Sequence, residues 1–163
     1  MKIAIIEPSS AAPEVELLKG LAVLHRLTHE PLPLPVAKTR SLFLAGTDSD
    51  RFMELKVALE DPSVGVLMAV RGGAGAQRLL PMLSRVRSKG NKILVGSSDL
   101  TYLGLALWKR FGIPFCHGPM LVRLARPDFS RAEGVFLKRA LERRDLAYSG
   151  VPGTESTPAQ WAM

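Results

Sequence analysis

The segment VGVLMAVRGGAG, residues 64–75, joins an uninterrupted apolar run to a glycine-rich turn, and a helical pattern follows at 76–86. An apolar run of this kind is typical of a strand buried on both faces of a parallel sheet. Glycines at its end allow positive φ angles and let backbone amides approach a ligand closely. The segment therefore predicts a strand, turn and helix, with the turn at the carboxyl edge of the sheet, where open α/β sheets bind ligands.

The same alternation continues in both directions along the chain. Further strands are expected at Lys2–Ile6, Lys92–Val95 and Ile113–His117. Further helices are expected at Pro13–His29, Arg51–Glu60, Leu100–Phe111 and Ser130–Arg144, the last with its basic residues on the outer side. Strands that alternate with helices predict the α/β class, here a layered α/β/α domain with a mainly parallel sheet.

Two early segments have more specific patterns. In the first helix, Val15, Leu18, Ala22 and His25 fall near one face, which we expect to be the packed face. Residues Pro31–Pro35 alternate proline with leucine, so alternate positions lack an amide proton. We expect this segment to be an extended edge or a linker.

Length and composition indicate one globular domain. The chain has 163 residues, of which 47% are hydrophobic and 23% charged, which excludes disorder of the whole chain. We assign residues 1–146 to the α/β domain. Residues 147–163 lose all periodicity and are expected to be a flexible tail or an interrupted linker. The single cysteine, Cys116, excludes a disulfide scaffold and a cysteine-based zinc module.

No apolar run approaches the roughly 20 residues that cross a bilayer, and the first apolar run reaches Glu7 too soon for a signal peptide. We therefore expect a cytoplasmic protein with no membrane partner. The net charge of +7 lies entirely in the second half, which could bind nucleic acid through Lys138, Arg139, Arg143 and Arg144. An aromatic content of 6% is low for base stacking, so this remains the least favoured hypothesis.

Two strand-to-helix turns could carry chemistry. The glycine turn at 71–75 could direct backbone amides at an anion or an oxyanion, or be a tight turn without a ligand. In Gly96-Ser97-Ser98-Asp99, a serine on a sharp turn could act as a nucleophile with the next amide as a donor. The alternative is a helix cap, since serine and aspartate are preferred caps and the GxSxG pattern is not met.

A serine nucleophile needs a base, and the histidines offer none by pattern alone. His25 and His29 lie in or just after the first helix, where surface or packing roles are expected. His117 ends a strand and so lies near the ligand edge, although a structural role is again the simpler interpretation. Nothing in the sequence completes a catalytic triad.

Taken together, the motifs resemble the LD-carboxypeptidases, the murein tetrapeptide carboxypeptidases of the serine peptidase family that includes the microcin-immunity peptidases. The similarity runs from Ile3 to about Arg123. In order, its motifs are Phe43-Leu44-Ala45-Gly46-Thr47-Asp48, Arg71-Gly72-Gly73-x-Gly75 with Arg78-Leu79-Leu80-Pro81, Gly96-x-Ser98-Asp99 and His117-Gly118-Pro119-Met120.

This resemblance implies a serine hydrolase that removes a terminal D-amino acid from a murein peptide, with no metal and no cofactor. It implies that Ser98 is the nucleophile and that the amides of Asp99 and Gly73 form the oxyanion hole. Contacts with the substrate are then expected from Arg71, Gly72, Ala74, Gly75 and His117.

The sequence also departs from the family pattern. The family takes its catalytic Glu and His from a C-terminal domain that these 163 residues do not contain. Ala74 and Ser97 replace aromatic residues, and Glu7 places a carboxylate near the end of the first strand. We therefore expect the chain to be inactive alone and to need that domain or a complementing chain. A homodimer and a non-catalytic homologue that binds peptides or proteins stay open as alternatives.

Overall fold

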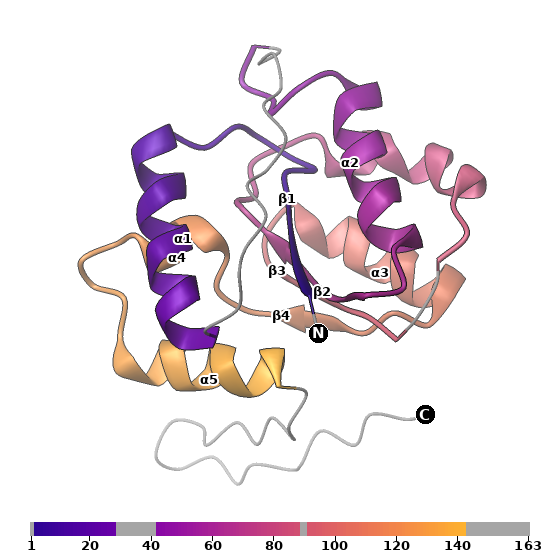
Figure 1. The fold of residues 1–163 in the computed structure, drawn as a ribbon. Helices are drawn as coiled ribbons and strands as arrows, with labels where there is room; N and C mark the ends of the chain where they lie inside the picture. The colour runs from indigo at the N-terminus through magenta and orange to yellow at the C-terminus, as the bar shows by residue number, and fades with distance from the viewer. Residues whose placement is uncertain (1, 29–41, 89–90, 143–163) are drawn as a thin grey trace, which may run out of the picture.

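The strands of this chain lie side by side in one parallel sheet, in the order β1-β2-β3-β4 (Figure 1). The computed structural model describes residues 2–28, 42–88 and 91–142. Within these ranges the strands are β1 (Lys2–Ile6), β2 (Val64–Ala69), β3 (Ile93–Gly96) and β4 (Phe115–His117). Because the strands are parallel, their carboxyl ends lie along one edge. The predicted layered α/β fold with a mainly parallel sheet is confirmed.

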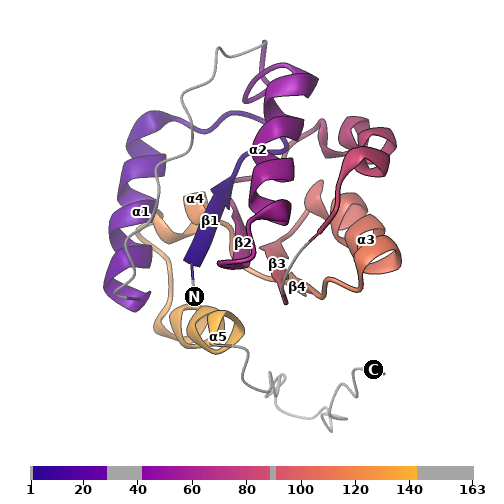
Figure 2. The ribbon, with the colours of Figure 1, turned by 45° about the vertical axis from the view of Figure 1, so that its right-hand side comes forward.

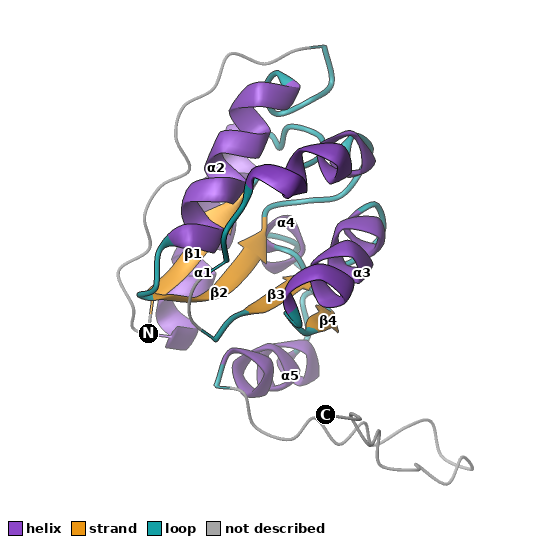
Figure 3. Ribbon diagram, turned by 90° about the vertical axis from the view of Figure 1, so that its right-hand side faces the viewer, coloured by secondary structure: helices purple, strands orange, loops and turns teal. Residues whose placement is uncertain are grey.

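Helices cover both faces of this sheet (Figures 2 and 3). One face carries α1 (Glu14–Thr28), α4 (Leu121–Leu124) and α5 (Arg131–Leu141). The other face carries α2 (Asp48–Glu60), the 3₁₀ helix η1 (Ala76–Arg85) and α3 (Leu100–Phe111). No helix in the described part of the chain is long and apolar enough to span a membrane.

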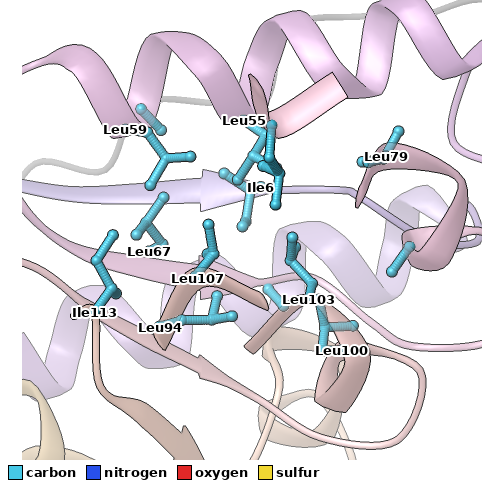
Figure 4. Packing of buried hydrophobic residues seen from close by; sticks show 14 of the residues in the cluster. Ile6, Leu55, Leu59, Leu67, Leu79, Leu94, Leu100, Leu103, Leu107 and Ile113 are labelled. Carbon is cyan, nitrogen blue, oxygen red and sulfur yellow. The ribbon is translucent and has the colours of Figure 1, made fainter. Parts of the chain in front are cut away.

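The sheet divides the hydrophobic core into two clusters, because successive strand residues point to opposite faces. The cluster beneath α2, η1 and α3 includes Ile6, Leu55, Leu59, Leu67, Leu79, Leu94, Leu103 and Leu107 (Figure 4). The cluster beneath α1, α4 and α5 includes Ile5, Leu24, Met68, Val95, Leu121 and Leu137. Every residue of β2 is buried, which explains why its sequence is an uninterrupted apolar run.

The face predicted for the first helix is wrong. Val15 and Leu18 are 62% and 51% exposed, and Ala22 and His25 are exposed as well. The packed face of α1 instead contains Gly20, Leu21 and Leu24. A Cβ atom on Gly20 would overlap the carbonyl oxygen of Leu121, so this glycine lets α1 approach α4 closely. Close packing on α4 therefore decides which face of α1 is buried.

Several element boundaries also differ from the predictions. Helix α2 begins at Asp48 rather than Arg51, because Thr47 and Asp50 form a reciprocal capping box. The predicted helix at 76–86 is the 3₁₀ helix η1, which contains Pro81. Proline lacks an amide hydrogen and its ring clashes with the preceding turn of an α-helix, which disfavours that form here. The short helix α4 was not predicted.

Some predictions fall on residues that the structure does not describe. These are the extended segment Pro31–Pro35, His29, the end of the last helix with Arg143 and Arg144, the domain boundary at 146, and the segment 147–163.

Candidate active site at the carboxyl edge of the sheet

Three loops meet where β1, β2 and β3 end. They are the loop that follows Ile6, the glycine turn that follows β2, and the turn 97–99 that joins β3 to α3. The parallel pairings of β1 with β2 and of β2 with β3 bring these strand ends together. Residues far apart in sequence therefore form one site.

Ser98 has a backbone conformation that residues other than glycine rarely adopt. Its φ angle is +59°, and it lies exposed between Gly96, the last residue of β3, and Leu100, the first of α3. The Thr101 amide donates to the Ser98 carbonyl at 2.9 Å and closes this turn. The predicted sharp turn at a strand-to-helix junction is confirmed, and its backbone is in a sparsely populated conformation. Such a turn presents a hydroxyl group above the edge of the sheet.

The carboxylate of Asp99 does not cap α3. Asp99 is the N-cap residue, but its side chain forms no capping hydrogen bond. Its Oδ2 atom instead accepts hydrogen bonds from Ser9 Oγ at 2.7 Å and from the Ala76 amide at 2.9 Å. Asp99 thereby ties the turn 97–99 to the loop after β1 and to the start of η1. The interpretation of this side chain as a helix cap is wrong.

Gly72 lies directly against the serine turn. A Cβ atom built on Gly72 would lie 3.1 Å from Ser98 Cβ, 3.3 Å from Ser98 Oγ and 3.5 Å from the Asp99 amide nitrogen. The absence of a side chain at this position therefore leaves room beside both the Ser98 hydroxyl and the Asp99 amide.

Ser10 holds the glycine turn on both sides of Gly73. The Ser10 amide donates to the Gly72 carbonyl at 3.3 Å, and the Ala74 amide donates to Ser10 Oγ at 3.2 Å. Gly73 has a φ angle of +113°, and a Cβ atom there would overlap Ser10 Oγ. Glycine is thus required at 73 by both conformation and space.

Two further predicted site residues lie at the same edge. The Arg71 side chain donates from Nη1 to the Ala11 carbonyl at 3.2 Å, so it lies along the loop after β1. His117 is exposed at the end of β4, paired with Gly96, and its ring meets Phe115 edge-on with centroids 6.0 Å apart. His25 lies in the last turn of α1, which runs back from the end of β1 toward the opposite edge (Figure 1).

Sequence reasoning assigned no role to Ser9 or Arg51, although both are fully buried polar residues beside these loops. A hydroxyl group directly after a strand, and an arginine in the first turn of an amphipathic helix, are ordinary surface features in a sequence. Only their burial distinguishes them, and burial depends on the packing of distant segments.

The remaining chemistry-bearing groups are limited. Burial raises the pKa of the Cys116 thiol to about 11, so the thiol is protonated at neutral pH and a poor nucleophile. Among residues 2–28, 42–88 and 91–142, no group of three His, Cys, Asp or Glu side chains could hold a metal ion.

Most of this chain matches known protein sequences. Residues 3–118 match the family described as the LD-carboxypeptidase N-terminal domain. A Streptomyces coelicolor protein that carries a carboxypeptidase name is 39% identical over 124 residues, which are 73% of this chain and 40% of that protein. The murein tetrapeptide carboxypeptidase of Pseudomonas aeruginosa is 31% identical over 134 residues, which are 79% of this chain and 42% of that enzyme.

Solved structures show the same fold. The muramoyltetrapeptide carboxypeptidase from Oxalobacter formigenes superposes with a TM-score of 0.73 at 28% identity, covering 86% of this chain and 47% of that chain. The microcin C7 self-immunity protein MccF superposes with a TM-score of 0.74 at 22% identity, covering 88% and 45%, a likeness of fold alone. This chain spans less than half the length of each of these relatives. By its sequence match over residues 3–118, the chain belongs to the LD-carboxypeptidase family.

Proposed function

We propose that the protein acts as a serine carboxypeptidase that removes the terminal D-amino acid from murein peptides, with Ser98 as the nucleophile. The observation that carries this proposal is the φ angle of +59° at Ser98, at the carboxyl edge of the sheet and against Gly72. A strained backbone at a solvent-exposed serine has a cost in stability, which function would explain.

In this proposal the oxyanion hole is formed by the backbone amides of Asp99 and Gly73. The Asp99 amide starts helix α3, where backbone N–H groups and the helix dipole favour negative charge. The contact of Gly72 with the serine turn, and the hydrogen bonds of Ser10 on both sides of Gly73, support the placement of the second donor.

The substrate would lie over the exposed rim of this edge. Ala74 and His117 are exposed there, and Arg71 and Gly75 are partly exposed. We propose that these residues contact the peptide. Ala74 and Ser97 are small, so they leave more room for a substrate at this edge than aromatic residues would.

The reaction would proceed by nucleophilic acyl transfer. Ser98 Oγ attacks the carbonyl carbon of the terminal peptide bond, its proton passes to a base, and the oxyanion is held by the two amides. The C–N bond then breaks, the amine of the D-amino acid takes the proton, and water hydrolyses the acyl-enzyme. We propose that the base and its orienting carboxylate come from the part of the family's length that this chain does not span.

We also propose that the protein works in the cytoplasm, on peptides released from the cell wall. A single cysteine that is buried is compatible with a reducing compartment.

In the test, the protein of residues 1–163 is mixed with the C-terminal part of the Oxalobacter formigenes enzyme, and the release of D-alanine from murein tetrapeptide is measured. Ser98→Ala is expected to reduce this release to background, because it removes the hydroxyl group that forms the acyl-enzyme in this proposal. Ser97→Ala is the matched control, since it removes the neighbouring hydroxyl group, and it should keep most of the activity. Equal rates for Ser98→Ala and the unmodified chain would refute the assignment of the nucleophile.

A further inference from the structure

The guanidinium group of Arg51, in the first turns of α2, is fully buried. Its Nε atom donates to the Gly46 carbonyl at 3.3 Å, and its Nη1 atom donates to the Gly75 carbonyl at 3.0 Å and to the Pro8 carbonyl. Its Nη2 atom donates to Asp48 Oδ1. A buried cation is costly unless it is paired and hydrogen-bonded, and here all three nitrogens have acceptors.

The carbonyl groups bound by Arg51 come from three separate segments. Pro8 lies in the loop after β1, Gly46 precedes α2, and Gly75 ends the glycine turn. A Cβ atom on Gly75 would lie 3.0 Å from Arg51 Nη1 and 2.8 Å from a methyl group of Leu44, so glycine is needed for this approach. The guanidinium group therefore joins two of the loops that form the candidate active site.

These contacts lie one residue away from the groups that hold the serine turn. The peptide unit between Gly75 and Ala76 accepts from Arg51 through its carbonyl and donates to Asp99 through its amide. Likewise, Arg51 binds the Pro8 carbonyl, and the next residue, Ser9, donates to Asp99. A cation and an anion are thus linked through the same peptide unit, which each polarises in the same direction.

The positive charge of the Arg51 guanidinium group is paired with the carboxylate of Asp48, which lies nearer the protein surface. Asp48 accepts from Arg51 and also forms an ion pair with the exposed Arg78, with Nη2–Oδ2 and Nε–Oδ1 distances of 2.6 and 2.9 Å. These hydrogen bonds with Arg78, followed by those with Arg51, hold the pKa of Asp48 below its usual value. The carboxylate stays ionised at neutral pH and pairs with the buried cation.

We propose that Arg51 is a positioning residue for the active site: through the Gly75–Ala76 peptide and the Pro8–Ser9 segment, it fixes Asp99 and the glycine turn around Ser98. The inference rests on the proposed function, because fixing Asp99 and the glycine turn matters for activity only if Ser98 is the nucleophile. The structural claim itself is testable without activity.

The test is amide hydrogen exchange measured by NMR on Arg51→Met and on the unmodified chain. The Ala74 and Ala76 amides report the turn, and the Leu67 and Leu94 amides report the core of the sheet. If Arg51 orders the turn locally, the ratio of turn to core exchange rates should rise at least about tenfold in the variant. A residue that only stabilised the whole fold would leave this ratio unchanged.

Lys92→Met is the matched control. Lys92 is a second buried cation, and it donates to the Asp61 and Val64 carbonyls at the opposite edge of the sheet, at 2.6 and 2.8 Å. Its replacement should speed exchange at all four amides and keep the ratio within about threefold. Arg51→Lys keeps a buried cation with fewer donors, and it decides the question in the same way if Arg51→Met does not fold.

An unchanged ratio in the folded Arg51 variant, or an equal rise in Lys92→Met, would overturn the proposal. Since exchange is read without substrate, this result is independent of the Ser98→Ala experiment. The proposed reaction and the proposed role of Arg51 can therefore fail separately.

Discussion

The position of Gly72 illustrates how one missing side chain shapes this site. A methyl group there would lie 3.3 Å from Ser98 Oγ and 3.5 Å from the Asp99 amide, so it would occupy the space that the proposed reaction assigns to the substrate carbonyl. The φ angle at this glycine is not in the left-handed region, in contrast to +113° at Gly73. Space, and not backbone strain, is therefore what requires glycine at 72.

We predict that Gly72→Ala lowers D-alanine release by the supplemented protein about tenfold or more, while the free energy of unfolding falls by only about 1 kcal/mol. The loss follows from crowding at the nucleophile, because the new methyl group meets Ser98 at distances tighter than ordinary contact. Steady-state kinetics and urea unfolding measure the two effects. Gly134→Ala is the control, since a Cβ atom there is 3.8 Å or more from its neighbours. Equal activity in both variants would contradict the prediction.

At the scale of elements, Arg123 of α4 binds the first turn of α5. Arg123 donates to Glu133 from Nε at 2.7 Å and from Nη2 at 3.0 Å, and to Asp128 from Nη1 at 2.9 Å. Glu133 also completes a capping box with Ser130, where α5 begins. The charged hydrogen bond with Arg123, followed by the Ser130 amide, lowers the pKa of Glu133 to about 2.

A lowered pKa in the folded state predicts a pH-dependent stability. Glu133 stabilises the fold at pH values above its unfolded pKa of 4.5, and this contribution disappears as the pH falls from 4.5 toward 2. Since its side chain is 31% exposed, solvent screening limits the effect of Glu133→Gln at pH 7 to about 1 kcal/mol.

Urea unfolding of Glu133→Gln at pH 7 and at pH 2.5 measures this difference, which should be small at the lower pH. The control is Glu142→Gln at the C-cap of the same helix, where Lys138 Nζ lies 3.9 Å away and the Lys138 side chain is 56% exposed. A Glu133→Gln effect that does not depend on pH would show that packing, and not charge, attaches α5.

At the scale of the whole molecule, the chain presents the exposed Ser98 at a sheet edge, and it spans less than half of its relatives' length. An alcohol keeps its proton at neutral pH, so Ser98 needs a base within about 3 Å to react. Backbone amides alone cannot start the reaction, because the oxyanion that they would stabilise forms only after a nucleophile has attacked.

We therefore predict that residues 1–163 alone release D-alanine from murein tetrapeptide barely above the uncatalysed rate. The rate should rise by orders of magnitude when the C-terminal part of the Oxalobacter formigenes enzyme is added. Chromatographic detection of D-alanine over hours distinguishes the two. Turnover by the isolated chain at ordinary enzymatic rates would contradict this, and His117→Ala would then show whether His117 is its base.

Much of the architecture could be predicted from local patterns. The apolar run at 64–70 is a buried strand because a parallel sheet covered on both faces needs apolar residues at every position. The turn at 97–99 was predicted as sharp because a strand runs into a helix with only a few residues between them. The family motifs added the resemblance to the LD-carboxypeptidases, and the match over residues 3–118 confirmed the family.

What the sequence determined by itself is therefore the succession of strands, turns and helices, since hydrophobic period and glycine act over neighbouring residues. Tertiary structure alone decided the rest. In the folded protein, Gly20 of α1 faces α4. The Asp99 carboxylate accepts hydrogen bonds from Ser9 and from the Ala76 amide instead of capping α3, and Arg51 is buried among three loops. Each of these depends on which distant polar group or backbone atom comes within contact distance, and no local pattern in a sequence records that distance.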